Sequence, residues 1–434
     1  MKILYVADNR DRHNWGCRAT SAALSEMLQE NNTIVGRISG RLTLYNDFVY
    51  LSAFAGAANS FVYSIPYGEK IFRKIFKFIP FMKADFLSYD LDDTIEKLKK
   101  YSKQNKVFAE LNIENYPEFD ALVINGEGTM IMSTPARRDT LYYLMLVHWA
   151  LKLGKKVFFL NAMFSDCPKT GKNSKTLELT EQVLKKCTLV TCREPMSYNY
   201  LCSNTKLNNI RMIPDALFTW KKYLQSNIVY NARSMFPFGY ESDENLNGVD
   251  LSKGYICVSG SSSAAWNKEV AFKSYLNLIQ RIKKEIDIPV LLVEVCDGDD
   301  FLRRVAKETN TLFIPVETPI VQGLNLLAHA KVYVSGRYHP GIMSSIGGVP
   351  VVFLGSNSYK NIGLQQLLKY DNPHEFSSIP DDSEVEKIIY CVNKYLNSPR
   401  IAESVISNVV DQAGQIKDLL SGFNCQSEGD CIWH

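Results

Sequence analysis

The sequence predicts an α/β protein built from two Rossmann-like domains. Short runs of β-branched and other apolar residues alternate with helical stretches along the chain, which is typical of a mostly parallel sheet. The length of 434 residues exceeds that of most single compact domains. A composition of 46% hydrophobic and 22% charged residues indicates an ordinary globular fold.

Composition also excludes several classes of protein. A net charge of +3 is too small to indicate a nucleic-acid partner, and no apolar run is long enough to span a membrane. The ten cysteines form neither a CxxC pair nor a Cys/His cluster at zinc spacing. The chain starts with Met-Lys and a strand rather than a signal peptide, so we expect a cytoplasmic protein with reduced thiols. We interpret Asp297, Asp299 and Asp300 as an acidic loop, and we expect neither a metal ion nor a cofactor.

The first half of the chain predicts one set of strand–helix units. A strand over Lys2 to Ala7 is followed by a helix from about Ala19 to Glu30. The loop between them, Asn14 to Thr20, lies where such folds present backbone N–H groups to a ligand, and its Asn14 and Arg18 are candidates for contacting an acceptor or closing over a donor. The further elements predicted are strands at 121–125, 156–161, 189–192 and 211–214, and a helix at about 140–154.

The second half repeats this pattern after residues 221–250, which are rich in Asn, Ser and Gly and predict an interdomain connection. We expect an N-terminal acceptor and catalytic domain over 1–230 and a C-terminal donor-binding domain over 231–434, the GT-B-type arrangement. A helical tail is predicted over about 383–420. The predicted strands are 255–259, 290–295, 311–315, 332–335 and 351–354.

The strand ends of the second half carry a candidate anion site. Arg337 offers a planar fork to a phosphate or carboxylate, and His339 can donate to a phosphate or act as a general acid. Alternatively, Arg337 pairs with a structural carboxylate and His339 is a satisfied buried histidine. The polar residues predicted to complete the site are Ser261, Ser356, Asn357, Ser358 and Lys360.

Two carboxylates follow strands of the first half. Glu127 lies between Gly126 and Gly128, which leaves few packing reasons for a carboxylate there. Asp215 follows Pro214 and is a candidate either for chemistry or for a helix N-cap. One carboxylate is a candidate general base for an acceptor hydroxyl with the other orienting the sugar, or the two form a nucleophile and acid/base pair.

Residues 335–368 resemble the C-terminal signature of the polysaccharide pyruvyl transferase family: Ser-x-Arg-x-His-x-x-Ile, a Gly-x-Pro before a strand, then a Lys ahead of a Leu-rich helix. The resemblance implies a GT-B-like transferase of cell-surface polysaccharide such as capsule or lipopolysaccharide. It implies transfer of a pyruvyl group from phosphoenolpyruvate onto a sugar as a ketal, with Arg337 and His339 binding the donor. Weaker matches occur in the same order at Asn14-x-Gly16, Asn125 to Thr129, Arg193-Glu194 with Ser197, and Pro214-Asp215.

The sequence departs from this family in two places. The usual all-glycine turn is replaced by Gly-Glu-Gly at Glu127, and Pro340 follows His339. A His-Pro pair is similar to the CMP-sugar site of bacterial sialyltransferases and related ulosonic-acid transferases. This similarity implies an alternative function, a retaining glycosyltransferase that uses a CMP-activated ulosonic acid such as CMP-Kdo, with Asp215 as nucleophile and Glu127 as acid/base. A third hypothesis is a non-catalytic glycan-binding protein.

Residues 70–83 combine five cations with a dense set of aromatic residues. Such a helix lies in a membrane interface or packs on its own domain. The first reading, together with the family resemblance, predicts peripheral contact with the inner face of the membrane and a lipid-linked glycan acceptor.

Overall fold

The computed structural model describes residues 1–39, 87–104, 112–225 and 254–422. The predicted membrane-contacting helix at 70–83 and the predicted domain boundary near residue 230 lie outside these ranges. The chain forms two compact units, each with its own parallel sheet, so the predicted α/β class is confirmed. Unit 1 consists of Met1–Asn9, Leu28–Cys192 and Tyr200–Arg211, and unit 2 of Arg10–Met27, Arg193–Asn199 and Met212–His434.

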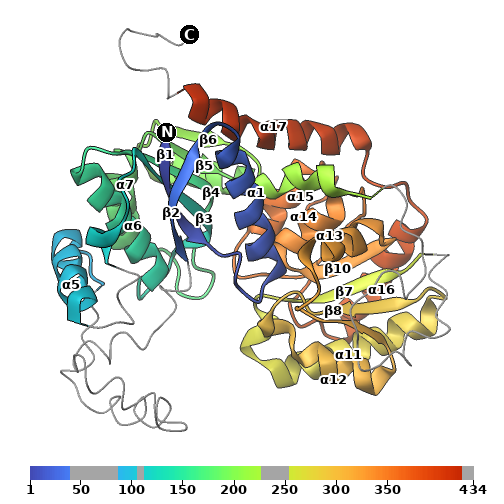
Figure 1. Cartoon of the computed structure of the whole chain (residues 1–434). Helices are drawn as coiled ribbons and strands as arrows, with labels where there is room; N and C mark the ends of the chain where they lie inside the picture. Colours follow the sequence, from blue (N-terminus) through green and yellow to red (C-terminus); the bar gives the residue numbers. More distant parts are fainter. Residues whose placement is uncertain (40–86, 105–111, 226–253, 423–434) are drawn as a thin grey trace, which may run out of the picture. The chain divides into compact units, whose positions relative to one another are not determined.

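Unit 1 is built on a six-stranded sheet with the order β2-β1-β3-β4-β5-β6, and the pairings among β1 to β5 are parallel (Figure 1). Helix α6 packs against β3 and β4 and lies between α5 and α7. The strands are β1 Lys2–Asp8, β2 Thr33–Ser39, β3 Ala121–Met132, β4 Lys156–Asp166, β5 Leu189–Cys192 and β6 Ile210–Met212. The helices that follow or cover them are α5 Leu91–Gln104, η4 Ile113–Asn115, α6 Arg138–Lys152, α7 Ser174–Leu184 and α8 Pro195–Asn204.

Several sequence-based predictions in this half were wrong, among them the end of the strand predicted at 156–161, which runs to Asp166. The strand predicted to end at Asn125 continues to Met132, because Glu127 adopts a left-handed conformation and the register with β4 shifts without ending the pairing. The predicted loop Asn14–Thr20 is largely helical, since α1 begins at Trp15 and runs to Asn31. Strand β2 was not predicted, because its side chains are mostly half-exposed and it lacks a clear apolar alternation.

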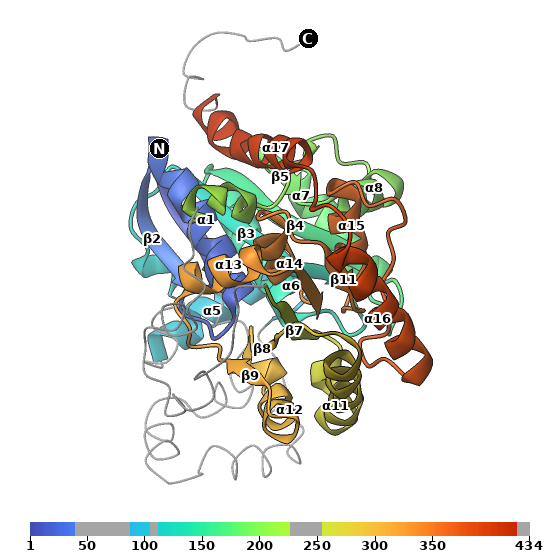
Figure 2. The ribbon, with the colours of Figure 1, turned by 90° about the vertical axis from the view of Figure 1, so that its right-hand side faces the viewer.

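Unit 2 contains a five-stranded sheet with the order β11-β10-β7-β8-β9 in which all neighbouring strands are parallel. Helices α11, α12 and α16 pack on one face, and α13 and α14 lie on the other (Figure 2). The strands are β7 Ile256–Ser261, β8 Val290–Val293, β9 Leu312–Ile314, β10 Val332–Gly336 and β11 Val351–Phe353. The helices are η5 Ala216–Tyr223, η6 Ala264–Trp266, α11 Lys268–Glu285, η7 Asp297–Asp299, α12 Phe301–Thr309, α13 Ile320–His329, α14 Tyr338–Ser345, α15 Lys360–Leu367, α16 Asp382–Leu396 and α17 Glu403–Gly422.

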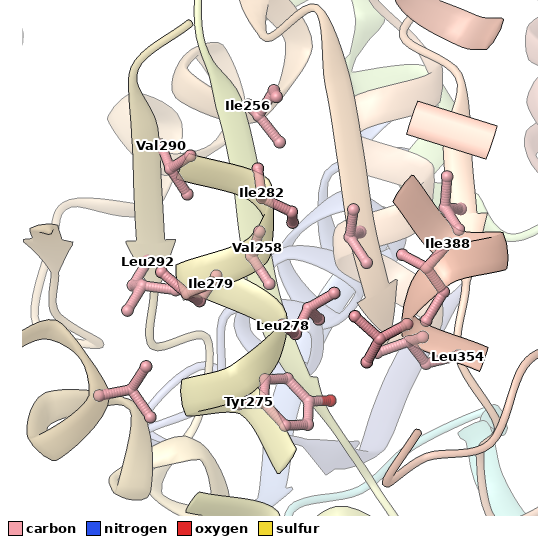
Figure 3. Close-up of a cluster of buried hydrophobic side chains, with 14 of the residues drawn as sticks. Ile256, Val258, Tyr275, Leu278, Ile279, Ile282, Val290, Leu292, Leu354 and Ile388 are labelled. Atoms are coloured by element: carbon pink, nitrogen blue, oxygen red, sulfur yellow. The ribbon is translucent and has the colours of Figure 1, made fainter. Parts of the chain in front are cut away.

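A hydrophobic core holds the helices of unit 2 against its sheet. Inward residues of β7 and β8, such as Val258 and Leu292, pack against the apolar stripe of α11, and Ile388 of α16 joins the same cluster on the side of β10 and β11 (Figure 3). The predicted tail helix is two helices instead of one, because Pro399 interrupts it and the residue before a proline disfavours helical backbone. No disulfide joins cysteines in the described part of the chain, and none of its helices is long and apolar enough to cross a membrane.

Candidate functional site

The strand order of unit 2 defines where a ligand crevice lies. The chain builds β7, β8 and β9 in one direction and then returns to place β10 and β11 on the other side of β7. The carboxyl ends of β7 and β10 therefore form the topological switch point, where open parallel sheets bind ligands. Gly336 ends β10 directly beside Ser261, and a Cβ on Gly336 would lie 2.5 Å from the Cβ of Ser261. Glycine is needed there for this close approach.

Arg337 follows this glycine and is held by an ion pair. Its Nη2 donates to Oδ1 of the fully buried Asp299 at 2.6 Å, and its Nη1 lies 3.5 Å from the hydroxyl of Ser262. Burial opposes the guanidinium charge, but the carboxylate of Asp299 outweighs burial and raises the pKa of Arg337 above its ordinary value. Arg337 is therefore charged and already neutralised by a carboxylate, and its role in donor binding stays a prediction.

A second cluster in unit 2 brings together three charged side chains from distant parts of the chain. The fully buried Asp215 accepts hydrogen bonds at Oδ1 from the hydroxyl of Thr20 (2.7 Å) and from the backbone N–H of Leu217 (3.0 Å). At Oδ2 it meets Nη1 of Arg193 and Nε2 of His339, each at 3.2 Å. Asp215 is thus both the N-cap of η5 and the counter-ion of two basic side chains.

The electrostatics of this cluster favour an anion. Burial alone raises the pKa of a carboxyl, but the charges of His339 and Arg193 more than offset it, and the pKa of Asp215 lies well below its ordinary value of 3.8. One ionised carboxylate therefore serves two basic groups, so a protonated His339 leaves a net positive charge. Nη1 of Arg193 also lies 2.8 Å from Nε2 of His339, so the neutral ring can accept this hydrogen bond. Nε2 of His339 therefore has both a basic and an acidic side chain within hydrogen-bonding distance.

Sequence analysis did not name Arg193 or Thr20 as site residues, although the family resemblance included Arg193. The available signal was an arginine directly after the buried strand β5, just as Asp215 follows shortly after β6. The ring of Tyr338 stacks on the Arg193 guanidinium at 4.3 Å. Gly16 in the first turn of α1 is also part of the cluster, because a Cβ there would lie 2.6 Å from Nδ1 of His339.

The loop after β11 supplies the remaining predicted donor residues, and they contact mainly each other. Lys360 donates to Oδ1 of Asn357 at 2.7 Å, and the hydroxyl of Ser356 donates to the carbonyl of Ser358 at 2.9 Å. Ser261 at the end of β7 donates to the carbonyl of Gly355, which follows β11 on the far side of β10. The structure gathers these residues on one edge of the unit 2 sheet, and Pro340 lies buried in the first turn of α14.

Glu127 lies at the switch point of the other sheet. In unit 1 the strand order reverses between β1 and β3, and Glu127, within β3, meets Asn9 just beyond the carboxyl end of β1. Oε1 of Glu127 accepts from the side-chain amides of Asn9 (2.7 Å) and Asn125 (3.1 Å), and Asn161 donates to the carbonyl oxygen of Asn125. The carboxylate is almost fully buried among neutral amides. Such a group can orient or deprotonate a hydroxyl.

The backbone around Glu127 is strained. Ala7, Glu127 and Asn161 have φ values of +61°, +41° and +58° on the adjacent strands β1, β3 and β4. Each costs about 1–3 kcal/mol for a residue with a Cβ, and such residues gather at functional sites.

The remaining predicted residues, Asn14 and Arg18, both belong to unit 2. The side chain of Asn14 caps α1 by accepting from the backbone N–H of Cys17 at 3.0 Å. The half-buried Arg18 guanidinium makes no hydrogen bond or ion pair within the described ranges. In these same ranges no group of His, Cys, Asp or Glu side chains is arranged to hold a metal ion.

Comparison with known proteins gives a family and a fold. The model of the family described as polysaccharide pyruvyl transferase matches residues 59–358. UDP-GlcNAc 2-epimerase from Methanocaldococcus jannaschii is similar in structure, with a TM-score of 0.53 and 14% identity over 97% of this chain and 100% of the epimerase. The enzyme from Neisseria meningitidis, solved with UDP-GlcNAc, gives a TM-score of 0.55 and 10% identity over 98% and 100%. These likenesses show a GT-B-like fold. No curated protein matched the sequence.

Proposed function

Because the chain belongs to the polysaccharide pyruvyl transferase family, and is therefore a transferase of polysaccharide biosynthesis, we propose that it transfers the pyruvyl group of phosphoenolpyruvate onto two hydroxyls of a sugar. Phosphoenolpyruvate carries a phosphate and a carboxylate on one small molecule. It needs closely spaced basic side chains, and the Arg193–Asp215–His339 cluster is the observation that carries this proposal.

The proposed reaction requires proton transfer, binding of the donor anion and activation of the acceptor hydroxyls. The two acceptor hydroxyls attack the same carbon of the donor, and phosphate leaves. Of the two protons that the hydroxyls lose, one ends on the donor methylene, which becomes a methyl group, and the other leaves with phosphate. To these steps we assign His339 for proton transfer, Arg193 for binding the donor anion, and Glu127 for orienting or deprotonating a hydroxyl.

The alternative, a retaining glycosyltransferase with a CMP-activated ulosonic acid, requires Asp215 to act as a nucleophile. Asp215 is fully buried, and both of its oxygens already accept hydrogen bonds or face a cation. Its strongly lowered pKa also makes it a weak base and a weak nucleophile. Only Pro340 and Glu127 support this alternative. A lipid-linked acceptor and peripheral membrane contact through residues 70–83 are parts of the proposal that rest on family and sequence alone.

A thermal-shift comparison tests the donor. Phosphoenolpyruvate at ten times its dissociation constant should raise the melting temperature by about 2–4 °C, whereas CMP should not. Arg193→Met and His339→Asn should lose this shift. Arg304→Met, which changes an exposed arginine on α12, should keep it. A shift with CMP and none with phosphoenolpyruvate would overturn the proposal in favour of glycosyl transfer.

A further inference from the structure

Two aromatic side chains are exposed at the carboxyl edge of the unit 2 sheet. Trp266 is 55% exposed and Tyr359 is 51% exposed. In the part of the chain that the structure describes, only two other aromatic side chains reach comparable exposure, Tyr223 at 36% and Tyr390 at 70%. Large aromatic rings bury most of their surface in folded proteins unless they serve a contact.

Their positions along the sheet place both rings beside the candidate donor site. Trp266 comes shortly after β7 and Tyr359 shortly after β11, and β10, which ends at Arg337, lies between these strands. Packing contacts support the position of Trp266 near Arg337. A Cβ on Gly298 would lie 3.1 Å from both the Cβ of Ala265 and Nη2 of Arg337. The turn that carries Trp266 therefore packs against the loop that holds Arg337.

Both rings are attached to backbone that is held in place. The backbone N–H of Trp266 donates to the carbonyl of Ser263 at 3.1 Å, and the next residue, Asn267, caps α11. The carbonyl of Tyr359 accepts from the N–H of Gly363 at the start of α15. Because this backbone is already ordered, and an aromatic side chain has only two rotatable bonds, covering the rings with a ligand costs little conformational entropy.

We propose that Trp266 and Tyr359 are stacking platforms for sugar rings of the acceptor glycan, on either side of the residue that reacts. A pyranose presents a face of C–H groups that packs on an aromatic ring, while its edge hydroxyls bind polar groups. Polar residues that can supply such groups lie close in sequence to each ring: Ser262 and Ser263 before Trp266, and Asn357 before Tyr359. The choice of a glycan rests on the proposed function, since phosphoenolpyruvate has no ring to stack.

Binding of the labelled full-length protein to an array of bacterial surface glycans tests this assignment without a donor. The wild type should bind a subset of the glycans. Trp266→Ala and Tyr359→Ala should each weaken that binding about tenfold, while Trp266→Phe retains most of it. Tyr390→Ala is the matched control, because it removes an exposed ring from α16 and should leave binding unchanged. Unaltered melting temperatures would confirm that the variants fold.

The outcomes separate this inference from the proposed donor. Absence of glycan binding by the wild type, or equal binding by wild type, Trp266→Ala and Tyr359→Ala, would overturn the stacking role even if phosphoenolpyruvate still raises the melting temperature. A CMP-induced shift that disappears in Trp266→Ala, with glycan binding unchanged, would mean that the ring stacks on a nucleobase and would also overturn it. Loss of glycan binding in both alanine variants would support the platforms even if phosphoenolpyruvate proved not to be the donor.

Discussion

The buried carboxylates of the two units have different surroundings. In unit 1 the carboxylate of Glu127 is surrounded by neutral amides, and three adjacent strands carry left-handed residues. In unit 2 the carboxylates of Asp215 and Asp299 face basic side chains, and the left-handed non-glycine residues Asn310 and Lys369 follow helices instead. Left-handed residues gather around Glu127 in unit 1, whereas ion pairs hold Asp215 and Asp299 in unit 2.

This difference has a physical meaning. A buried charge is tolerated only with a partner, so the unit 2 edge is stable only while its ion pairs are intact. Neutral amides around one carboxylate leave lone pairs and N–H groups that match hydroxyls. The contrast predicts unequal sensitivity of the two sites to substitutions.

The largest effect on stability is expected for Asp215→Asn. The change leaves Arg193 buried without its carboxylate, which should lower the free energy of unfolding by about 3–5 kcal/mol. Denaturant-induced unfolding measures it. Asp297→Asn, which affects an exposed carboxylate 3.4 Å from His13, is the control and should change stability by less than about 0.5 kcal/mol. Equal stability of the two variants would show that the cluster is not held by charge.

Local features of these sites could be predicted from the sequence, whereas contacts between residues far apart in the sequence could not. The apolar run Leu189–Cys192 identified β5 with its correct bounds, because a short buried strand is a local pattern. The ion pair of Asp215 with Arg193 spans 22 positions, and its contact with His339 spans 124. Sequence alone placed each residue at a strand end but gave no means of pairing them.

Arg337 and Glu127 show two other limits. The sequence presented Asp299 as part of an acidic loop, and only the fold turns it inward to neutralise Arg337. The glycines around Glu127 suggested a turn, whereas the strand continues through a left-handed residue. A left-handed backbone conformation at a residue with a Cβ cannot be predicted from the local sequence, because contacts with the surrounding structure impose it.

A smaller, pH-dependent effect is expected at Glu375. Burial raises the pKa of Glu375 to about 7, with Asn361 and Lys360 only partly offsetting it. Because the folded pKa lies above the ordinary value of 4.5, the folded state holds the proton more tightly. The associated stability is present below pH 4.5 and is lost as pH rises to about 7.

Glu375→Gln should therefore be more stable than the wild type by about 1–3 kcal/mol at pH 8 and equal to it near pH 4.5. Unfolding curves across this pH range measure the difference, with the exposed Glu118→Gln as the control. A constant difference between variant and wild type at every pH would mean that folding does not shift the pKa of Glu375.

The smallest effect on stability is expected for Glu127→Gln, and it tests the other edge. The glutamine carbonyl oxygen can still accept from Asn9 and Asn125, so the free energy of unfolding should fall by less than about 1 kcal/mol.

A neutral amide cannot accept a proton from a hydroxyl, and turnover should fall about 100-fold if Glu127 is a general base. Phosphate release from phosphoenolpyruvate measures turnover, and the donor-induced thermal shift should be unchanged because the donor is assigned to unit 2. Full turnover in Glu127→Gln would leave Glu127 only an orienting role. The strained backbone around it would then position the side-chain amides of Asn9 and Asn125 to bind hydroxyls, and not a base.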